Sequence, residues 1–287
     1  MKRHFLTLVF MLFASQAIAQ APYLSLEDVV AMKRVTSASI SPDNRFVAYT
    51  VSVPREVYKD KDGGAFTELH VTDLDGNSRP YITGDVNVSS VRWSADGESL
   101  YFLSKRDKDA KFNSLYRIPV AGGEAEKLFT HVSSIGAIYP SPDGEIIAFT
   151  ATDKAPEKKK ELADLGFKAE IYEEALPFTR VWMYDIASGE AALQDIEGNA
   201  STFAWDASGE RYAVAMAPTP LVDDTYTSRD ITVVDADKGK ALNKIGSTGK
   251  LGDFAFSPDG DRIAYIGSVD IHDPAEGRLY VTSSTGG

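Results

Sequence analysis

The 287-residue sequence contains no cysteine. Disulfide bonds and lipid attachment to a cysteine are therefore excluded, and the fold must be stabilised by burial of a core. Histidine is scarce as well, with four residues in the whole chain. No H-E-x-x-H motif, calcium-loop spacing or phosphate loop occurs. We therefore expect neither a metal ion nor a cofactor.

The sequence also lacks a G-x-S-x-G nucleophile elbow. His70 falls within a predicted strand and His131 in a predicted turn, and neither has an obvious acidic partner in the sequence. His272 stands between Asp270 and Asp273, which we interpret as an exposed loop rather than a metal cluster. These residues do not form a recognisable catalytic set, so we predict that the chain alone is inactive as a hydrolase.

Basic residues are fewer than acidic ones, 30 against 42, and the formal net charge is −12. This balance argues against nucleic acid and anionic membrane surfaces as partners. It favours a soluble protein and, more weakly, a cationic or amine-bearing ligand.

The first 19 residues have the pattern of a secretory signal peptide. Lys2 and Arg3 precede an apolar run, Phe5–Ala14, that is too short to span a bilayer. Ala17-Ile18-Ala19 then fits a cleavage site. We expect cleavage after Ala19, a periplasmic or secreted protein, and no membrane insertion of the mature chain.

One short phrase recurs along the chain: a strand, a tight turn and a second strand, as in Phe254–Ile266. Proline, aspartate and glycine at the turn positions suit the backbone angles of a tight turn. Five copies begin at Ser41, Ser94, Ser141, Asp206 and Ser257. In the first copy Asn44 replaces glycine, and asparagine tolerates a positive φ better than most residues.

A second phrase, a strand that usually ends in a turn, follows each copy of the first. Its copies are Leu69–Gly76, Leu115–Gly123, Val181–Gly189, Ile231–Asp235 and Leu279–Thr282. Two interlocked repeats with a period of roughly 50 residues indicate a β-propeller with one four-stranded blade per repeat. We predict an all-β fold of antiparallel blades over residues 36–287, with about five blades present.

Three segments depart from the repeat. Residues 20–35 are predicted to hold a short helix, Leu24–Arg34, capped by Ser25 and stapled by Leu24 against Val29. The longest step between copies contains an insertion, 153–179, whose proline-to-glycine stretch 156–166 suits a second helix. The last repeat has no fourth strand, so we expect an incomplete blade and a chain that is part of something longer.

The order of signal peptide, short helix and immediate Ser-Pro-Asp repeats resembles the N-terminal half of the prolyl oligopeptidase family of serine peptidases. The resemblance covers residues 23–287 and points to the acylaminoacyl-peptidase and dipeptidyl-peptidase branches. It implies that a C-terminal α/β-hydrolase domain, absent here, carries the catalytic serine, aspartate and histidine. It also implies short peptides as substrates.

Within the insertion, Tyr172-Glu173-Glu174 resembles the stretch with which dipeptidyl peptidases hold the free amine of a substrate. Two carboxylates facing an ammonium would form charge-assisted hydrogen bonds. Alternatively, Glu173 and Glu174 are a solvated acidic patch beside Lys158–Lys160.

Two other functions stay open. A periplasmic protein-binding propeller of the Tol-system kind uses similar repeats, but that architecture has a separate α/β domain before its blades. A propeller enzyme with a central-channel site, such as a lyase or lactonase, would need channel-facing histidine or carboxylate ligands.

Overall fold

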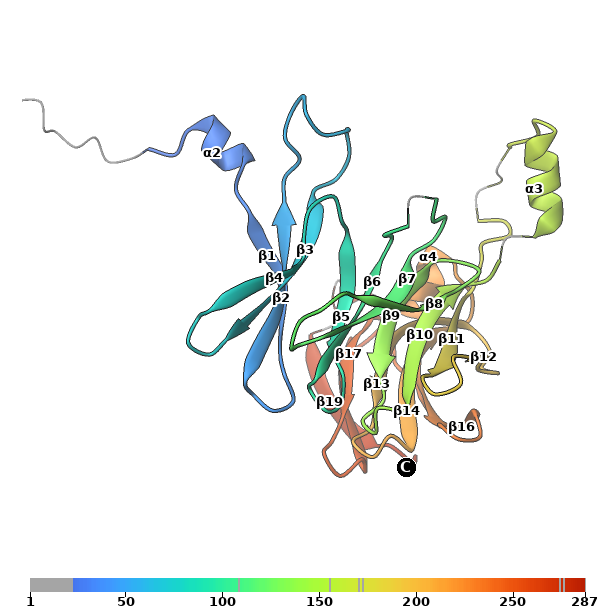
Figure 1. The fold of residues 1–287 in the computed structure, drawn as a ribbon. Coiled ribbons are helices and arrows are strands. Elements are labelled where there is room, and N and C mark those ends of the chain that lie inside the picture. The colour runs from blue at the N-terminus through green and yellow to red at the C-terminus, as the bar shows by residue number, and fades with distance from the viewer. Residues whose placement is uncertain are drawn as a thin grey trace, which may run out of the picture.

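The computed structural model describes residues 23–286 apart from 108, 155, 170, 172, 274 and 276, so the expected signal peptide and Tyr172 lie outside the described residues. The described chain forms a β-propeller of five antiparallel sheets that follow one another in sequence order. Four sheets have four strands and the fifth has three, as the repeats predicted. Consecutive sheets contact each other (Figure 1).

The first two sheets contain the strands β1 (Arg34–Ile40), β2 (Phe46–Val53), β3 (Phe66–Asp73), β4 (Ser78–Ile82), β5 (Val88–Trp93), β6 (Ser99–Ser104), β7 (Ser114–Pro119) and β8 (Glu126–Thr130). The third sheet contains β9 (Ile135–Pro140), β10 (Ile146–Thr152), β11 (Thr179–Asp185) and β12 (Ala191–Leu193). The last two contain β13 (Asn199–Trp205), β14 (Arg211–Ala217), β15 (Asp230–Asp235), β16 (Lys240–Ile245), β17 (Leu251–Phe256), β18 (Arg262–Gly267) and β19 (Arg278–Ser283). The helices are α2 (Leu26–Val30), α3 (Glu157–Asp164) and α4 (Val222–Thr227).

The recurring turn closes the first hairpin of every sheet. Its fourth residue has a positive φ in all five copies, including 58° at Asn44 and 74° at Gly260. In the first copy the Asp43 carboxylate accepts the Ser41 hydroxyl at 2.6 Å and the backbone N–H of Arg45 at 3.0 Å. The same pattern recurs at the second, third and fifth turns. The repeated aspartates therefore hold turns together, as the sequence predicted.

Burial follows the position of each sheet in the series. The second strands of the three middle sheets, β6, β10 and β14, are buried on both faces. A middle blade is covered by a neighbour on each side, so both faces of its strands need apolar side chains. The second strands of the first and last sheets, β2 and β18, are buried less completely. Indole N–H groups also link neighbours, since Trp93 donates to the Ser39 carbonyl and Trp205 to the Tyr139 carbonyl.

The N-terminal helix is shorter than predicted. A capping box forms between Ser25 and Asp28, but α2 ends at Val30, and Arg34 already pairs with Ser52 in the first sheet. The apolar residue Leu26 of this helix is 82% exposed on the described chain. A cap stabilises one turn, whereas a longer helix needs a surface against which to bury its apolar face.

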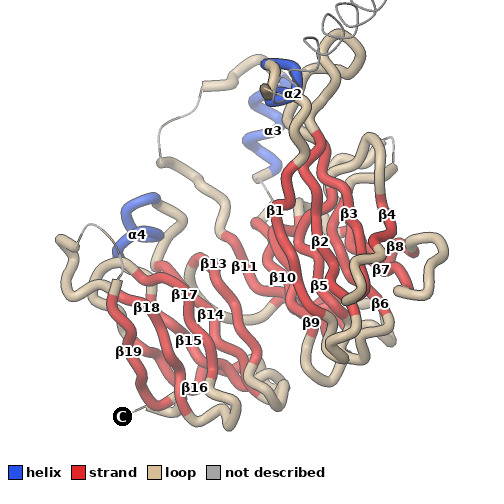
Figure 2. The backbone as a smooth tube through the Cα atoms, turned by 90° about the vertical axis from the view of Figure 1, so that its left-hand side faces the viewer, coloured by secondary structure: helices blue, strands red, loops and turns tan. Residues whose placement is uncertain are grey.

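Antiparallel order places all second-to-third-strand connections at one end of the sheets. These connections are 54–65, 105–113, 153–178, 218–229 and 268–277, and we call this end the insertion face. The short first hairpins lie at the opposite end. Helices α2, α3 and α4 all lie toward the insertion face (Figures 1 and 2). Helix α4 lies in the β14–β15 connection. None of the helices in the described part of the chain could span a membrane.

Candidate functional site

The long insertion joins β10 to β11, the second and third strands of the third sheet. It begins with α3, whose N-cap is Pro156, and Gly166 ends the helical region with a φ of 95°. It returns to the sheet through residues 173–178. The proline and glycine thus act where the sequence predicted, and the insertion lies on the insertion face.

Glu173 and Glu174 lie in a turn near the end of this insertion. Both side chains are exposed, and the Glu174 N–H donates to the Ile171 carbonyl at 3.2 Å. Glu173 and Ala175 have positive φ values of 62° and 52°, a conformation that costs a residue with a Cβ about 1–3 kcal/mol. Neither residue lines the hollows at 111–178 and 195–244 that are described below.

A hollow of about 760 Å³ lies directly beside this turn. Its lining comes from three separate parts of the chain: the β6–β7 connection, the β8–β9 connection and both ends of the insertion. We call it the lysine pocket, because its basic lining residues are Lys111, Lys154, Lys159 and Lys160. Ala175, the residue after Glu174, is part of its wall.

A buried histidine, His131, lies next to the lining residues Val132 and Ser133 in the sequence. His131 packs against Phe149 and Trp182, with ring centroids 5.5 and 4.6 Å away. Its Nδ1 lies 3.1 Å from the Ser133 hydroxyl, which in turn donates to the Thr152 carbonyl at 2.6 Å. Burial lowers the pKa of the imidazole below its usual value of 6.5.

The sequence did not indicate this Ser–His contact. It has no catalytic geometry, because the Ser133 hydroxyl is buried and already donates to a backbone carbonyl. Aromatic rings, not a carboxylate, surround the other side of His131. The pair therefore holds Ser133 and Thr152, two lining residues of the pocket, in place.

His70 differs from the sequence interpretation, which found no acidic partner for it. Its Nε2 lies 3.1 Å from the Glu68 carboxylate, and its ring stacks on Tyr49. Burial raises the pKa of Glu68, but hydrogen bonds from the Gly84 N–H and His70 outweigh burial, so this pKa lies below its usual value of 4.5. Residues two apart on a strand share one face, a pairing that the sequence could have indicated.

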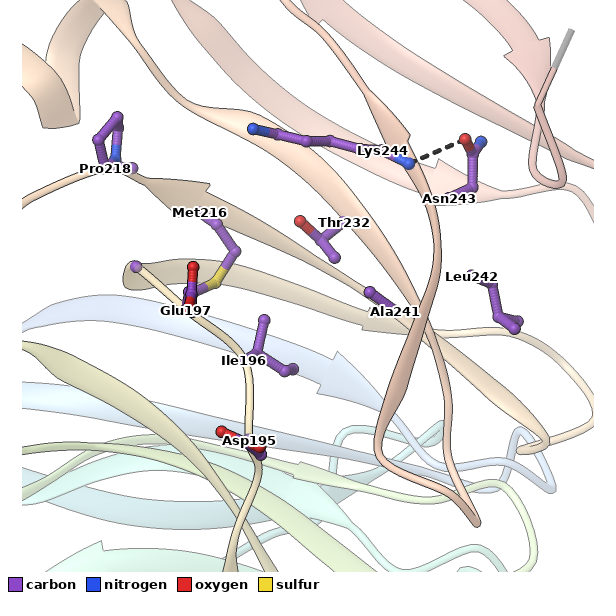
Figure 3. Close-up of a pocket in the computed structure, with 12 residues that line it drawn as sticks. Asp195, Ile196, Glu197, Met216, Pro218, Thr232, Ala241, Leu242, Asn243 and Lys244 are labelled. Carbon is purple, nitrogen blue, oxygen red and sulfur yellow. Dashed lines mark hydrogen bonds between the residues drawn. The ribbon is translucent and has the colours of Figure 1, made fainter.

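A second hollow, of about 740 Å³, lies between the loop 195–198 and strands β14 to β16 (Figure 3). Its acidic residues are Asp195 and Glu197, and its basic residue, Lys244, already pairs with Asp230 at 2.7 Å. Thr232 supplies the hydroxyl of its lining, with no histidine beside it. Within the described residues, no group of three or more side chains could hold a metal ion, and His272 lies in an exposed turn.

No family model matches the sequence. Dipeptidyl-peptidase 5 from Porphyromonas endodontalis is 26% identical over 275 residues, which span 86% of this chain and 38% of that protein. An uncharacterized peptidase, YuxL, from Bacillus subtilis is 33% identical over 129 residues, 45% of this chain and 19% of its own length. Both relatives are peptidases, in keeping with the resemblance to the N-terminal propeller of the prolyl oligopeptidase family.

Solved structures show the same propeller fold. Pyrococcus horikoshii acylaminoacyl peptidase superposes with a TM-score of 0.62 at 14% identity, covering 89% of this chain and 39% of that one. TolB from Acinetobacter baumannii superposes with a TM-score of 0.56 at 16% identity, covering 88% of this chain and 53% of that one. The chain thus spans less than two fifths of the length of the curated peptidases that it matches.

Proposed function

We propose that this chain is the propeller of a secreted serine exopeptidase that cleaves short peptides. The nucleophile, base and orienting acid would come from a hydrolase domain of the same protein. The observation that carries this proposal is the similarity to peptidases, which for dipeptidyl-peptidase 5 extends over 86% of the chain. The insertion face supports it, because every long connection and all three described helices lie there.

In this proposal the insertion face covers the catalytic site and limits access to short, flexible chains. Enclosing a site also excludes water, which strengthens the electrostatic interactions within it. The rival function, a protein-binding scaffold of the Tol kind, shares the fold at 16% identity, close to the 14% of the acylaminoacyl peptidase, so the solved structures do not separate the two functions. The curated sequence relatives are peptidases, and this favours the enzyme.

We further propose that Glu173 and Glu174 bind the free amine of the substrate. On the described chain both carboxylates are exposed, and an exposed ion pair is worth only about 0–1 kcal/mol. Their role therefore requires that a hydrolase domain covers the turn and removes it from bulk water. The strained backbone at Glu173 supports a function for this turn, because strain is retained where the surroundings impose it.

The test is a kinetic comparison in the whole protein. Glu173→Gln and Glu174→Gln should each raise KM for free-amine dipeptidyl substrates about 10- to 100-fold, since a hydrogen bond to a charged group contributes roughly 1.5–3 kcal/mol. N-acylated substrates should be little affected.

Glu190→Gln is the matched control, because Glu190 is equally exposed but lies in the β11–β12 turn at the opposite end of the same sheet. Equal kinetics of the Glu173 and Glu174 variants and the parent on both substrate types would reduce the pair to surface charge. That result would favour acylaminoacyl-peptidase or endopeptidase specificity.

A further inference from the structure

The charge of the lysine pocket is opposite to that of the chain. The chain carries a net charge of −12, yet four lysines and only two carboxylates line this hollow. Both carboxylates are already paired, Asp153 with Arg180 at 3.2 Å and Glu157 with Lys154 at 3.5 Å. The pocket therefore keeps an excess of positive charge on an acidic protein.

Lys111 and Lys160 contribute to this excess from separate segments of the chain. Lys111 comes from the β6–β7 connection and Lys160 from α3 in the insertion. Neither forms an ion pair within the described part of the chain. The Lys111 ammonium lies 5.1 Å from the centroid of the Phe112 ring, so its positive charge is next to an apolar surface.

Apolar side chains form the rest of the wall. Phe112 and Phe178 are half-buried, and Leu176 is 39% exposed. The guanidinium of Arg180 covers the Phe178 ring at 4.6 Å and so fixes this wall from behind. A volume of about 760 Å³ is typical of small-molecule sites, which range over about 300–1,000 Å³.

We propose that the lysine pocket binds the C-terminal end of a short peptide. An apolar side chain of the peptide would lie against Leu176 and Phe178, and its carboxylate would lie toward Lys111 and Lys160. The identification of the ligand as a peptide rests on the proposed function. A polyanion fits less well, because the wall between the lysines is apolar.

The position of the pocket next to Glu173 and Glu174 also predicts the orientation of the bound peptide. Glu173 and Glu174 directly precede the wall residue Ala175, so anionic and cationic groups flank one apolar hollow. A zwitterionic dipeptide would place its amine near the glutamates and its carboxylate near the lysines. This arrangement suits a site that holds a short peptide or a released dipeptide.

The test is calorimetric titration of the purified chain with the dipeptide Ala-Phe and with its C-terminal amide. The free acid should bind about three- to tenfold more tightly than the amide at low salt, because each exposed ion pair adds a modest interaction. Raising the ionic strength should reduce the difference. In Lys111→Gln/Lys160→Gln the difference should largely disappear.

Lys158→Gln is the matched control, because Lys158 lies on the same helix but does not line the pocket. A second variant, Leu176→Ser, should weaken binding of the acid and the amide alike. Equal binding of acid and amide by the parent, or no binding of either, would overturn the proposal.

The result is independent of the amine test. N-acetylated Ala-Phe reports on the lysines without the free amine. If the chain binds the acid more tightly than the amide, but the Glu173 variant leaves substrate kinetics unchanged, only the role of the glutamates is refuted. If the Glu173 variant changes substrate kinetics, but the chain binds acid and amide equally, only the role of the pocket is refuted.

Discussion

Replacement of Arg211 by leucine should weaken the contact between the fourth and fifth sheets and destabilise the fold. Arg211 follows the fourth recurring turn, and its Nε donates to the Asp206 carboxylate at 3.0 Å. Its Nη1 and Nη2 cross to the fifth sheet, where they donate to the Ser284 hydroxyl at 3.2 Å and the Gly260 carbonyl at 3.0 Å. One side chain therefore neutralises a buried acid and joins two sheets.

The magnitude follows from the burial of Asp206, whose side chain is 1% exposed. Removing one partner of a fully buried ion pair costs about 3–5 kcal/mol, because an uncompensated charge is left behind. The Arg211 side chain is 21% exposed, so solvent screens part of the interaction. We expect Arg211→Leu to lower the free energy of unfolding by about 2–4 kcal/mol.

The measurement is urea unfolding followed by far-UV circular dichroism. Arg45→Leu is the matched control, because Arg45 pairs with Asp43 in the first recurring turn at 2.6 Å but is 69% exposed. That change should cost only about 0–1 kcal/mol. Adding Asp206→Asn to Arg211→Leu should recover part of the loss, since the buried charge is then gone. Equal midpoints for the Arg211 and Arg45 variants would refute the reasoning.

Two further predictions concern pH and backbone conformation. Burial lowers the pKa of His131 below 6.5, so the unfolded chain binds a proton more readily than the folded chain, and the stabilising contribution of this histidine is lost as pH falls from about 7 toward 5. The melting temperature of His131→Leu should therefore fall less over this pH range than that of the parent. Equal pH slopes of the two melting temperatures would contradict this prediction. A Cβ at Gly198, where φ is 110°, would lie 2.6 Å from the Ala217 carbonyl oxygen. Gly198→Ala should therefore lower the free energy of unfolding by more than about 2 kcal/mol in the same urea assay, roughly twice the cost of a positive φ alone. Gly76→Ala, with a φ of 87° and open space around the added Cβ, should cost only about 1 kcal/mol, and similar losses for both would show that the contact is not limiting.

The sequence alone determined the blades, because their turns are local. An aspartate that accepts hydrogen bonds from residues two positions away acts within a few residues, whatever lies around it. This is why Asn44 could be assigned a positive φ, and why five hairpins could be counted. The peptidase resemblance likewise rested on the order of local phrases.

Only the tertiary structure decided burial and the composition of the pocket. Asp206 is the first residue of its turn, a position that is also buried at Ser41, Ser94 and Ser141, whereas Asp43 is the third residue of its turn and its side chain is 27% exposed. Helix α2 ends at Val30, and none of its residues is buried on the described chain. The lysine pocket unites segments from residues 111 to 178, and Glu173 and Glu174 proved to be beside it rather than in it. Such proximity depends on how sheets pack against one another, and no local pattern encodes it.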